Sequence, residues 1–318
     1  MKRTLLMLIG LLSAASSFAQ HLPLFTQYRE NLSIINPGAI NHDYMLYEHS
    51  LSFGVSYRTQ WTDVENSPET QVLRGDYIFA DNGAVGLIAG GYILNDQTGP
   101  TGMTGVYGRV GGILTDDPYY GGLSLGLSFG LVQYRVNGSE IRLRELNDVL
   151  LGNDDSQLFP DVGFGVYYYK LISGGILDDS RVYGGISVPQ VFGLDLEFEN
   201  DAGQYKLGRV QHFYGLLGLY KYFRDDSFIE PSVWIKYVPN APVNVDFNLR
   251  YQFPGSFWLG TGLSTAGNAH LEAGFLLGEN LGFDNNFRIG YGLDYSFQSF
   301  GPTVGSTHEI NLSYTIGQ

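Results

Sequence analysis

The stretch "VNVDFNLRYQF", residues 243–253, alternates apolar and polar side chains without interruption. Its odd-numbered residues, such as Val243 and Phe247, are apolar, and its even-numbered residues, such as Asn244 and Arg250, are polar. Because successive side chains of a strand point to opposite faces, this period of two predicts a strand with one apolar face. Such a strand fits a soluble sandwich. It also fits an outer-membrane barrel, in which lipid covers the apolar face and the polar face lines a lumen.

The same alternation recurs along the chain in segments of about the 9 to 11 residues that a tilted membrane strand requires. In "LSFGVSYRTQ", which starts at Leu51, and "FRIGYGLDYSF", which starts at Phe287, the two faces are cleanly separated. We expect about fourteen strands, an even number as in bacterial barrels. They are predicted at 48–59, 70–80, 84–95, 102–114, 120–135, 160–171, 181–189, 211–223, 227–238, 243–253, 256–264, 269–277, 286–297 and 307–316.

The connections between these segments favour the membrane barrel. Every second one is short and rich in turn-forming residues. These are "DNG" at 81–83, "DDP" at 116–118, "RDD" at 224–226 and "PG" at 254–255. Longer polar stretches at 137–159 and 190–209 lie between them. Short periplasmic turns and long outer loops are typical of outer-membrane barrels, and fourteen strands would place both ends of the chain on the periplasmic side.

The composition indicates the same class of protein. The chain has 43 Gly, 23 Tyr and 20 Phe, and only 16% of its residues are charged, against about 25% in soluble domains. A surface-exposed soluble sandwich is the alternative, but it would not need such an excess of glycine and aromatic residues over fourteen segments. We therefore predict an all-β fold, a transmembrane outer-membrane β-barrel of about 14 antiparallel strands.

The first residues have the pattern of a signal peptide. Lys2 and Arg3 precede an apolar run from Leu5 to Leu12, and small residues end at Ala19. This predicts an exported protein whose mature chain begins near Gln20. Beyond the leader no apolar stretch approaches the roughly 20 residues of a membrane helix.

Three regions are therefore expected. Residues 1–19 would be the signal peptide, 20–47 an N-terminal periplasmic or plug segment, and 48–318 the barrel. Pro23 and Pro37 break regular structure in the second region, while Leu24, Phe25 and Tyr28 need the lumen or a partner to pack on.

Charge and the reactive residue types exclude several functions. Removing Lys2 and Arg3 with the leader leaves 16 basic against 32 acidic residues, a net charge of −16 in place of −14. Nucleic acid is therefore an unsuitable partner. The absence of cysteine excludes thiolate chemistry, and the six histidines form no pair at metal-binding spacing. The acidic pairs and clusters in 154–155 and 197–201 lack the spacing of a calcium loop. We expect no metal and no cofactor.

The opening of the mature chain, "LPLFTQYRENLSIINPGAIN" (22–41), has no strand pattern. It resembles the start of the PorP/SprF family of type IX secretion system outer-membrane proteins, with its Leu-Pro-x-Phe-x-Gln-Tyr stretch and its Asn36-Pro37-Gly38 step. The resemblance continues in order through "YRTQW" (57–61), "GDYIF", "FPDVGFGVYYY", "YGGISVPQVF", "FIEPSVWIKY", "FWLGTG", "IGYGLDYS" and "STHEINLSY" (306–314). It spans almost the whole mature chain.

The resemblance implies an outer-membrane accessory component of the type IX secretion and gliding machinery, and not an enzyme. It would bind a large secreted adhesin and support its export or its retention at the cell surface. Its partners would be that adhesin, periplasmic and lipoprotein components of the machinery, and outer-membrane lipid. A passive porin or small hydrophobic-solute transporter remains the alternative function.

Two sets of residues are candidates for function. The family motifs point to partner binding by Asn36, Pro37, Arg58, Gln60, Trp61, His308 and Glu309. For Arg58 and Trp61 the structural alternative is a lumen salt bridge and an aromatic-belt anchor, and for His308 it is a hydrogen bond at a strand end.

The second set consists of charges that alternation places on the lumen face. It comprises Arg58, Arg74, Asp76, Arg109, Glu230, Lys236, Asp246, Arg250, Glu272, Arg288, Asp294 and Glu309. Since both signs are present, we expect these charges to pair across the interior and close it, because unpaired charges in a narrow lumen are unfavourable. An open channel lined by the same residues is the alternative.

Overall fold

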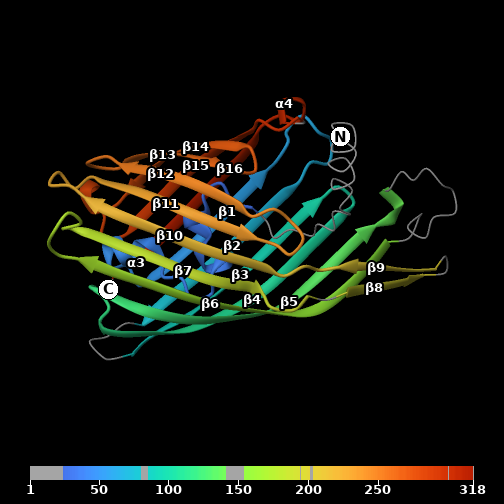
Figure 1. Cartoon of the computed structure of the whole chain (residues 1–318), viewed down its shortest axis with the longest axis horizontal. Coiled ribbons are helices and arrows are strands. Elements are labelled where there is room, and N and C mark those ends of the chain that lie inside the picture. Colours follow the sequence, from blue (N-terminus) through green and yellow to red (C-terminus); the bar gives the residue numbers. More distant parts are fainter. Residues whose placement is uncertain are drawn as a thin grey trace, which may run out of the picture.

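The computed structural model describes residues 24–79, 85–140, 154–193, 195–200, 203–299 and 301–317, so the predicted signal peptide lies outside the described residues. Within these residues fourteen antiparallel strands close into a barrel (Figure 1). They are β1 (Leu51–Thr59), β2 (Glu69–Phe79), β3 (Val85–Thr98), β4 (Thr101–Asp117), β5 (Gly121–Asn137), β6 (Asp154–Ile172), β7 (Ser180–Gln190), β10 (His212–Tyr222), β11 (Phe228–Tyr237), β12 (Asn244–Gln252), β13 (Phe257–Ser264), β14 (Asn268–Leu277), β15 (Asn286–Ser296) and β16 (Thr307–Ile316). Each overlaps one predicted range, which confirms the predicted barrel.

The order of the strands around the barrel follows the chain. β1 pairs with β16, with Leu51 opposite Ile316 and Thr59 opposite His308, and this pairing closes the sheet. A closed sheet has no unpaired edge, so the strand amides and carbonyls can be bonded within the lipid layer. Between β7 and β10 the chain forms a separate two-stranded hairpin, β8 (Asp195–Asn200) and β9 (Gly203–Gly208).

The two faces of each strand meet different surroundings, as the segment 243–253 illustrates. On β12, Phe247 is 56% exposed and Leu249 44%, while Asn248 is 6% exposed and Arg250 2%. The apolar side chains therefore point outward to lipid and the polar ones into the lumen. Lipid thus covers the apolar face of residues 243–253, and the polar lumen lies against their other face.

The strands differ in length, and the longest leave the membrane. β12 and β13 have 9 and 8 residues, whereas β5 and β6 have 17 and 19, more than the roughly 9 to 11 of a membrane strand. On the outer face of β5, exposed Phe129 and Leu131 are followed by exposed Gln133 and Arg135. This change from apolar to charged residues marks the point where β5 leaves the lipid.

The hairpin β8–β9 corrects one expectation, because residues 190–209 were predicted to be a polar loop. In the sequence, Leu196 and Phe198 alternate with acidic residues, and Tyr205 and Leu207 alternate with polar ones. Each run is short and acidic residues dominate the first, so the strand signal is weak. The hairpin and the extended ends of β5 and β6 project at the end of the barrel that also carries α4 (Gly301–Val304) (Figure 1).

The two ends of the barrel are named by their connections. At the turn end, short segments such as 118–120, 223–227 and 253–256 join the strands. At the loop end lie the long connections 138–153 and 191–211. The loop end also has the short connections 99–100 and 265–267, so the predicted asymmetry holds for the longest connections and not for each one.

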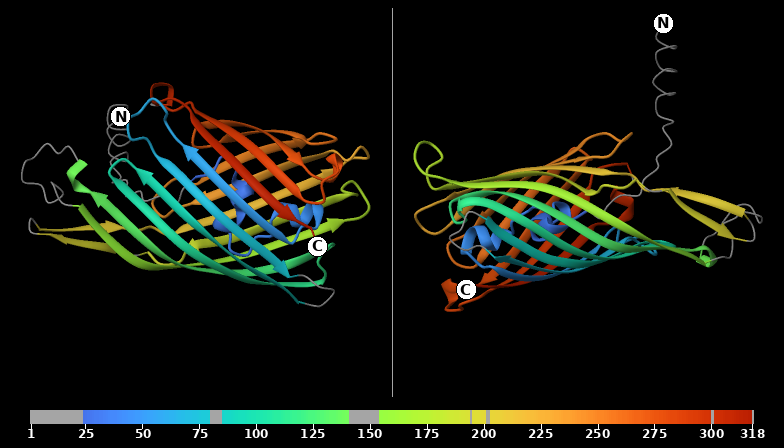
Figure 2. Two further views of the ribbon diagram at one scale, coloured as in Figure 1. Left: turned by 180° about the vertical axis from the view of Figure 1, so that it is seen from behind. Right: turned by 90° about the horizontal axis from the view of Figure 1, so that it is seen from below.

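The chain before β1 lies inside the barrel (Figure 2). It contains η1 (Tyr28–Asn31), α2 (Leu32–Ile35) and α3 (His42–Tyr47), and most of residues 25–45 are buried. We call residues 24–50 the N-terminal segment. No helix in the described part of the chain is long and apolar enough to cross a membrane.

The N-terminal segment runs from the loop end to the turn end. Leu24 lines a cavity with Trp61 and Gly305 at the loop end, and α3 leads into β1, which starts at the turn end. The carboxyl-terminal strand ends at the turn end as expected, but the first described residues lie at the opposite end. An even number of strands places the start of β1 and the end of β16 at the same end of the barrel. It places no constraint on the start of a segment that passes through the lumen.

Candidate functional site

The start of the N-terminal segment is held by two carboxylates of the barrel wall near the loop end. The backbone amides of Thr26 and Gln27 donate to Glu309 of β16 at 2.7 and 3.1 Å. The Thr26 hydroxyl donates to Asp294 of β15 at 2.6 Å. On β15, a Cβ at Gly290 would collide with Oε1 of Gln27, so the glycine leaves room for the end of this side chain.

Farther along, the Asn36-Pro37-Gly38 step forms a compact turn against β6 and β7. Asn36 Nδ2 donates to the carbonyls of Val166 at 3.0 Å and Ile186 at 3.4 Å. Asn36 Oδ1 accepts from the amide of Gly38 at 2.8 Å. The Asn36 side chain therefore both shapes the turn and attaches it to the wall.

The wall opposite this turn is bare backbone. A Cβ at Gly165 of β6 would collide with Asn36 Oδ1, and a Cβ at Gly126 of β5 would collide with the carbonyl of Pro37. At Gly185 of β7 an added Cβ would lie 2.6 Å from Asn36 Nδ2. Three neighbouring strands thus lack side chains at the place where the turn docks, which explains one glycine in each of "LGLSFG", "VGFGV" and "YGGIS", namely Gly126, Gly165 and Gly185.

Charges of the N-terminal segment meet opposite charges of the wall at the middle of the lumen. Arg29 pairs with Glu230 at 2.8 Å and with Glu272 at 3.4 Å, and its Nη2 donates to Ser232 at 3.2 Å. Arg29 is 3% exposed and Glu230 0%. Next to it, Tyr28 stacks on Trp234 with ring centroids 5.3 Å apart.

Beside Arg29, acidic residues of the N-terminal segment pair with arginines of the wall. Glu30 pairs with Arg74 and with Arg288, each at 3.4 Å, and Asp43 pairs with Arg288 at 2.7 Å. His42 Nε2 also contacts Arg288. His42 Nε2 also lies 3.5 Å from a carboxylate oxygen of Glu30 and of Asp43, so the imidazole is enclosed by charged side chains.

The remaining lumen charges pair mainly within the wall. Arg109 lies 3.5 Å from Asp76 and donates to the carbonyl of Ala39 at 2.6 Å, while Lys236 pairs with Asp246 at 2.5 Å. Arg250 has no ion pair among the described residues.

Aromatic rings cover the guanidinium of Arg250. Its Cζ lies 4.7 Å from the ring centre of Trp258 and 5.9 Å from that of Phe228, a cation–π arrangement. Arg250 thus shares the lumen with the predicted charges but takes its contacts from rings.

The sequence reasoning placed the wall charges but missed their partners. Arg29, Glu30 and Asp43 supply opposite charges, in a segment for which the sequence predicts only the packing of apolar residues. The charged residues in "YREN" and "NHDY", within a segment that has no strand pattern, are the sequence feature that could have indicated these partners. Four of the predicted lumen charges pair with the N-terminal segment, namely Glu230, Glu272, Arg74 and Arg288. Seven pair with each other within the wall, as predicted: Arg58, Asp76, Arg109, Lys236, Asp246, Asp294 and Glu309.

The space left inside the barrel is divided. A cavity of about 550 Å³ opens at the turn end and one of about 220 Å³ at the loop end. Between them, beside Glu30, His42 and Arg74, a cavity of about 10 Å³ remains, room for about one water molecule at most. Asn31 and Ile40 in this middle region are 0% exposed. The N-terminal segment therefore fills the waist of the barrel.

The loop-end cavity brings together three of the candidate partner-binding residues, and a fourth, Glu309, lies behind it beside Arg58. Arg58, Gln60 and Trp61 line it, and Arg58 lies 3.1 Å from Asp294 and 3.7 Å from Glu309. Arg58 is 5% exposed, and its Nη1 has no hydrogen-bond partner.

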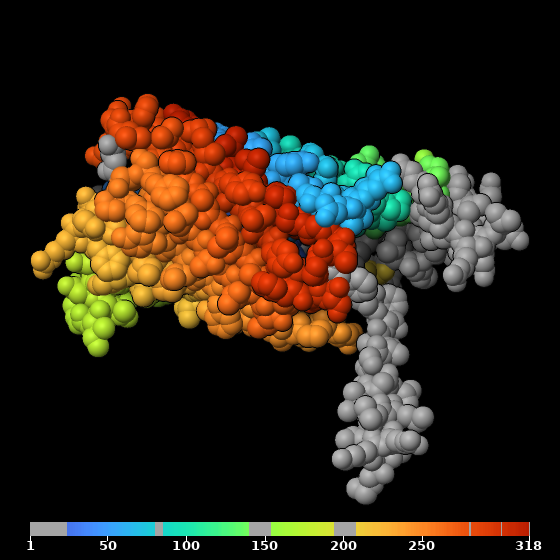
Figure 3. Space-filling view, turned by 90° about the horizontal axis from the view of Figure 1, so that it is seen from above, coloured from blue at the N-terminus to red at the C-terminus, as the bar shows by residue number. Residues whose placement is uncertain are grey.

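Trp61 stands at the rim of this cavity. It is 43% exposed and has a φ of +54°, an unusual conformation for a bulky side chain. Its loop is fixed by bonds from the amides of Thr62 and Asp63 to the carbonyls of Ser306 and Val304. In Figure 3 the light-blue residues of this loop touch the red residues that follow β15.

The other three candidates lie elsewhere. His308 lies on the outward face of β16. Its ring nitrogens form hydrogen bonds with the Tyr291 hydroxyl at 2.6 Å and the Ser306 hydroxyl at 2.8 Å. Asn36 and Pro37 lie deep in the lumen against β5 to β7. The seven residues therefore form one group at the loop end, one anchor within the lumen and one outward-facing histidine.

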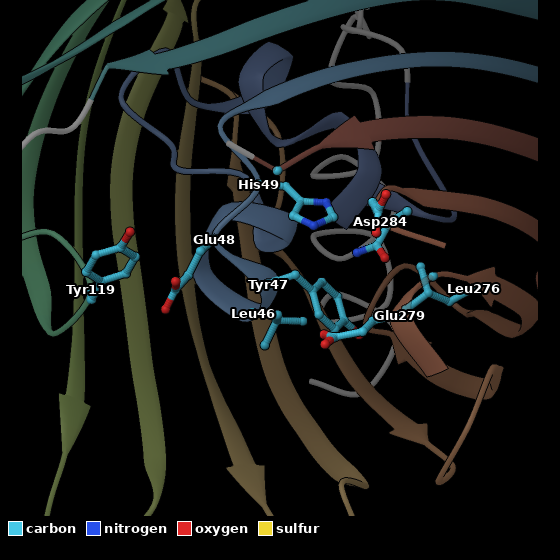
Figure 4. A pocket seen from close by; sticks show the side chains of 11 residues that line it. Leu46, Tyr47, Glu48, His49, Tyr119, Leu276, Glu279 and Asp284 are labelled. Atoms are coloured by element: carbon cyan, nitrogen blue, oxygen red, sulfur yellow. The ribbon is translucent and has the colours of Figure 1, made fainter. Parts of the chain in front are cut away.

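The turn-end cavity is different in character (Figure 4). Tyr47, Glu48 and His49 at the end of the N-terminal segment line it, together with Glu279 and Asp284 from the β14–β15 connection. The described residues contain no group of three or more His, Cys, Asp or Glu side chains placed to hold a metal ion.

Comparisons with known proteins agree on the class. The family model of the type IX secretion system membrane protein PorP/SprF matches residues 17–314. Among curated proteins, none matches the sequence.

Two solved structures illustrate the fold that this chain resembles. CymD, a monoaromatic hydrocarbon channel, is 10% identical, with a TM-score of 0.54 over 93% of this chain and 94% of that one. The toluene transporter TodX of Pseudomonas putida is 9% identical, with a TM-score of 0.51 over 95% of this chain and 100% of that one. At such low identity these similarities concern the fold alone.

Proposed function

Because the chain belongs to the PorP/SprF family of type IX secretion system membrane proteins, we propose that it is an outer-membrane accessory component of the secretion and gliding machinery. In this role it binds a large secreted adhesin and supports its export or its retention at the cell surface. The longer loops face the outside and the short turns face the periplasm, as in other outer-membrane barrels.

The filled waist of the barrel supports this proposal independently of family membership. The waist of the barrel is filled by the N-terminal segment and leaves about 10 Å³, so an exported chain has no path through this lumen. The barrel then acts by binding its partners at its two ends. Buried ion pairs such as Arg288 with Asp43, 2.7 Å apart, keep the segment in place.

The loop end is the proposed contact with the adhesin. Trp61 is an exposed aromatic residue at the rim of a cavity that Arg58 also lines, and tryptophan and arginine are enriched among the residues that dominate binding energy at interfaces. Gln60 adds an amide at the same rim, while Glu309 positions Arg58. The extended ends of β5 and β6 and the β8–β9 hairpin enlarge this surface.

The second candidate function, a passive porin or small hydrophobic-solute transporter, draws on the similar fold of two hydrocarbon transporters. It requires a continuous path through the barrel, and the filled waist argues against one. Movement of the N-terminal segment would have to accompany each passage.

The test compares surface display of secreted proteins in cells that carry the wild type, a deletion of the protein, or the variant Trp61→Ala. We expect the deletion to abolish display of one or a few large proteins. Trp61→Ala should lower that display by about tenfold or more, because a hot-spot truncation costs about 2 kcal/mol or more. Proteins shaved from intact cells and measured by mass spectrometry provide the readout.

The matched control is Tyr120→Ala, which removes an aromatic side chain, 61% exposed, at the turn end. It should leave display unchanged, and all variants should reach wild-type levels in the outer membrane. Unchanged display in the deletion strain would refute the proposed function. Loss in the deletion but not in Trp61→Ala would refute the proposed contact at the loop end.

A further inference from the structure

The turn-end cavity has an unbalanced charge. Glu48, Glu279 and Asp284 line it, and none of its lining residues is lysine or arginine. All three carboxylates are exposed, and no ion pair of theirs occurs within the described part of the chain. This contrasts with the interior, where Glu230 and Asp43 each have an arginine partner within 2.8 Å.

The walls of the cavity also suit a cationic side chain. Tyr47 and Tyr119 stand on its walls, and Figure 4 shows Glu48 and Tyr119 on one side with Glu279 and Asp284 on the other. Aromatic faces attract ammonium and guanidinium groups. At about 550 Å³ the cavity has room for a long side chain and part of its backbone.

A buried, unused hydrogen-bond donor points to a peptide and not to a free cation. Asn286 lines the cavity and is 5% exposed, and its Nδ2 has no hydrogen-bond partner. A bound metal ion or amine offers nothing for this donor, whereas a peptide offers a carbonyl oxygen. The carboxylates are spread around the rim and form no metal-binding cluster among the described residues.

An apolar cleft adjoins the same connection. It measures about 490 Å³ and is lined by Phe283, Phe287 and Tyr314, with Asp284 shared between the two cavities. Phe283 is 54% exposed. Phe287 and Tyr314 lie on the outward faces of β15 and β16, so this cleft faces the lipid side of the rim and not the acidic cavity.

We propose that the turn-end cavity is a docking site for a peptide segment of a periplasmic protein, which inserts a lysine or arginine side chain between its carboxylates and tyrosines. The inference rests on the proposed function for its orientation, with the turn end facing the periplasm, and deepens it by naming the chemistry of the inner partner. The cavity ends blindly at α3, where Met45 and His42 are each 2% exposed, so the segment enters and leaves from the periplasmic side.

The first test measures binding of a fluorescent Lys-Leu-Lys-Leu peptide to the purified full-length protein in detergent, with Glu-Leu-Glu-Leu as the opposite-charge probe. The lysine peptide should bind and the glutamate peptide should not. The triple variant Glu48→Gln, Glu279→Gln, Asp284→Asn should weaken binding by at least about tenfold.

The control variant removes the same charge at the same end outside the cavity, by changing the exposed residues Asp116, Asp179 and Asp226 to asparagine. It should bind like the wild type. Equal loss in both variants would show that only net charge matters and would overturn the inference. Undiminished binding to the cavity variant, or equal binding of the glutamate peptide, would also overturn it.

The second test places both triple variants in cells and measures surface display of the adhesin. The cavity variant should lose display while the control retains it. If the cavity variant fails to bind the peptide yet displays the adhesin normally, docking at the turn end is refuted. The proposed function would still stand if the deletion strain and Trp61→Ala lose display.

Discussion

At the loop end, Arg58 lies between Asp294 and Glu309, and both carboxylates also bind the N-terminal segment. At the turn end, Glu48 and Glu279 line a cavity more than twice as large, about 550 against 220 Å³, with no lysine or arginine among its lining residues. The same segment forms part of both mouths. Where the segment enters the barrel, its amides and the Thr26 hydroxyl therefore satisfy the wall carboxylates by hydrogen bonds, whereas where it joins β1 the carboxylates stay exposed and the opening is acidic.

The largest expected effect comes from removing the cation between the two mouths. Arg29→Ala would leave Glu230 and Glu272 buried without Arg29, at a cost of about 3–5 kcal/mol. The midpoint of unfolding in denaturant, followed by heat-modifiable migration on gels, should fall accordingly. Arg135→Ala, which removes an exposed arginine of β5, should change stability by about 0.5 kcal/mol or less.

A neutral replacement checks the cause of that loss. Arg29→Met combined with Glu230→Gln and Glu272→Gln removes all three charges together and should recover much of the stability. If Arg29→Ala were as stable as Arg135→Ala, the buried ion pairs would not hold the segment.

A smaller effect is expected where the segment touches bare backbone. Gly165→Val would push against Asn36 and displace the turn, with an overpacking cost of about 1–3 kcal/mol. Trypsin should then cleave after Arg29, which is 3% exposed in the wild type, and mass spectrometry would detect the new end. Gly112→Val is the matched control, since a Cβ there meets no atom within 4 Å. Equal resistance of both variants to trypsin would show that the turn does not depend on the glycine.

These features differ in how far the sequence could predict them. The barrel was predictable because each strand carries its own signal, as Phe247 outside and Arg250 inside illustrate. The order of charges on the wall followed from the same alternation. The hairpin β8–β9 was missed because its runs are short and acidic residues dominate the first.

The path of the N-terminal segment could not be read in this way. Its packing is set by contacts between residues far apart in the chain, such as Thr26 with Glu309 and Asn36 with Val166. No local period encodes such contacts. The family motifs that contain Gly165, Gly290 and Glu309 were visible in the sequence, but their shared task of receiving the segment emerges only in three dimensions.

The central claim is that this barrel is closed at its waist and works by binding at its two mouths. Its most direct test is the ion current through the wild-type protein, inserted without a partner into planar bilayers. We expect no steady conductance, because the buried N-terminal segment fills the waist and leaves a cavity of only about 10 Å³ between the two mouths. A stable open channel in the wild type would show that the waist is open and would favour the porin.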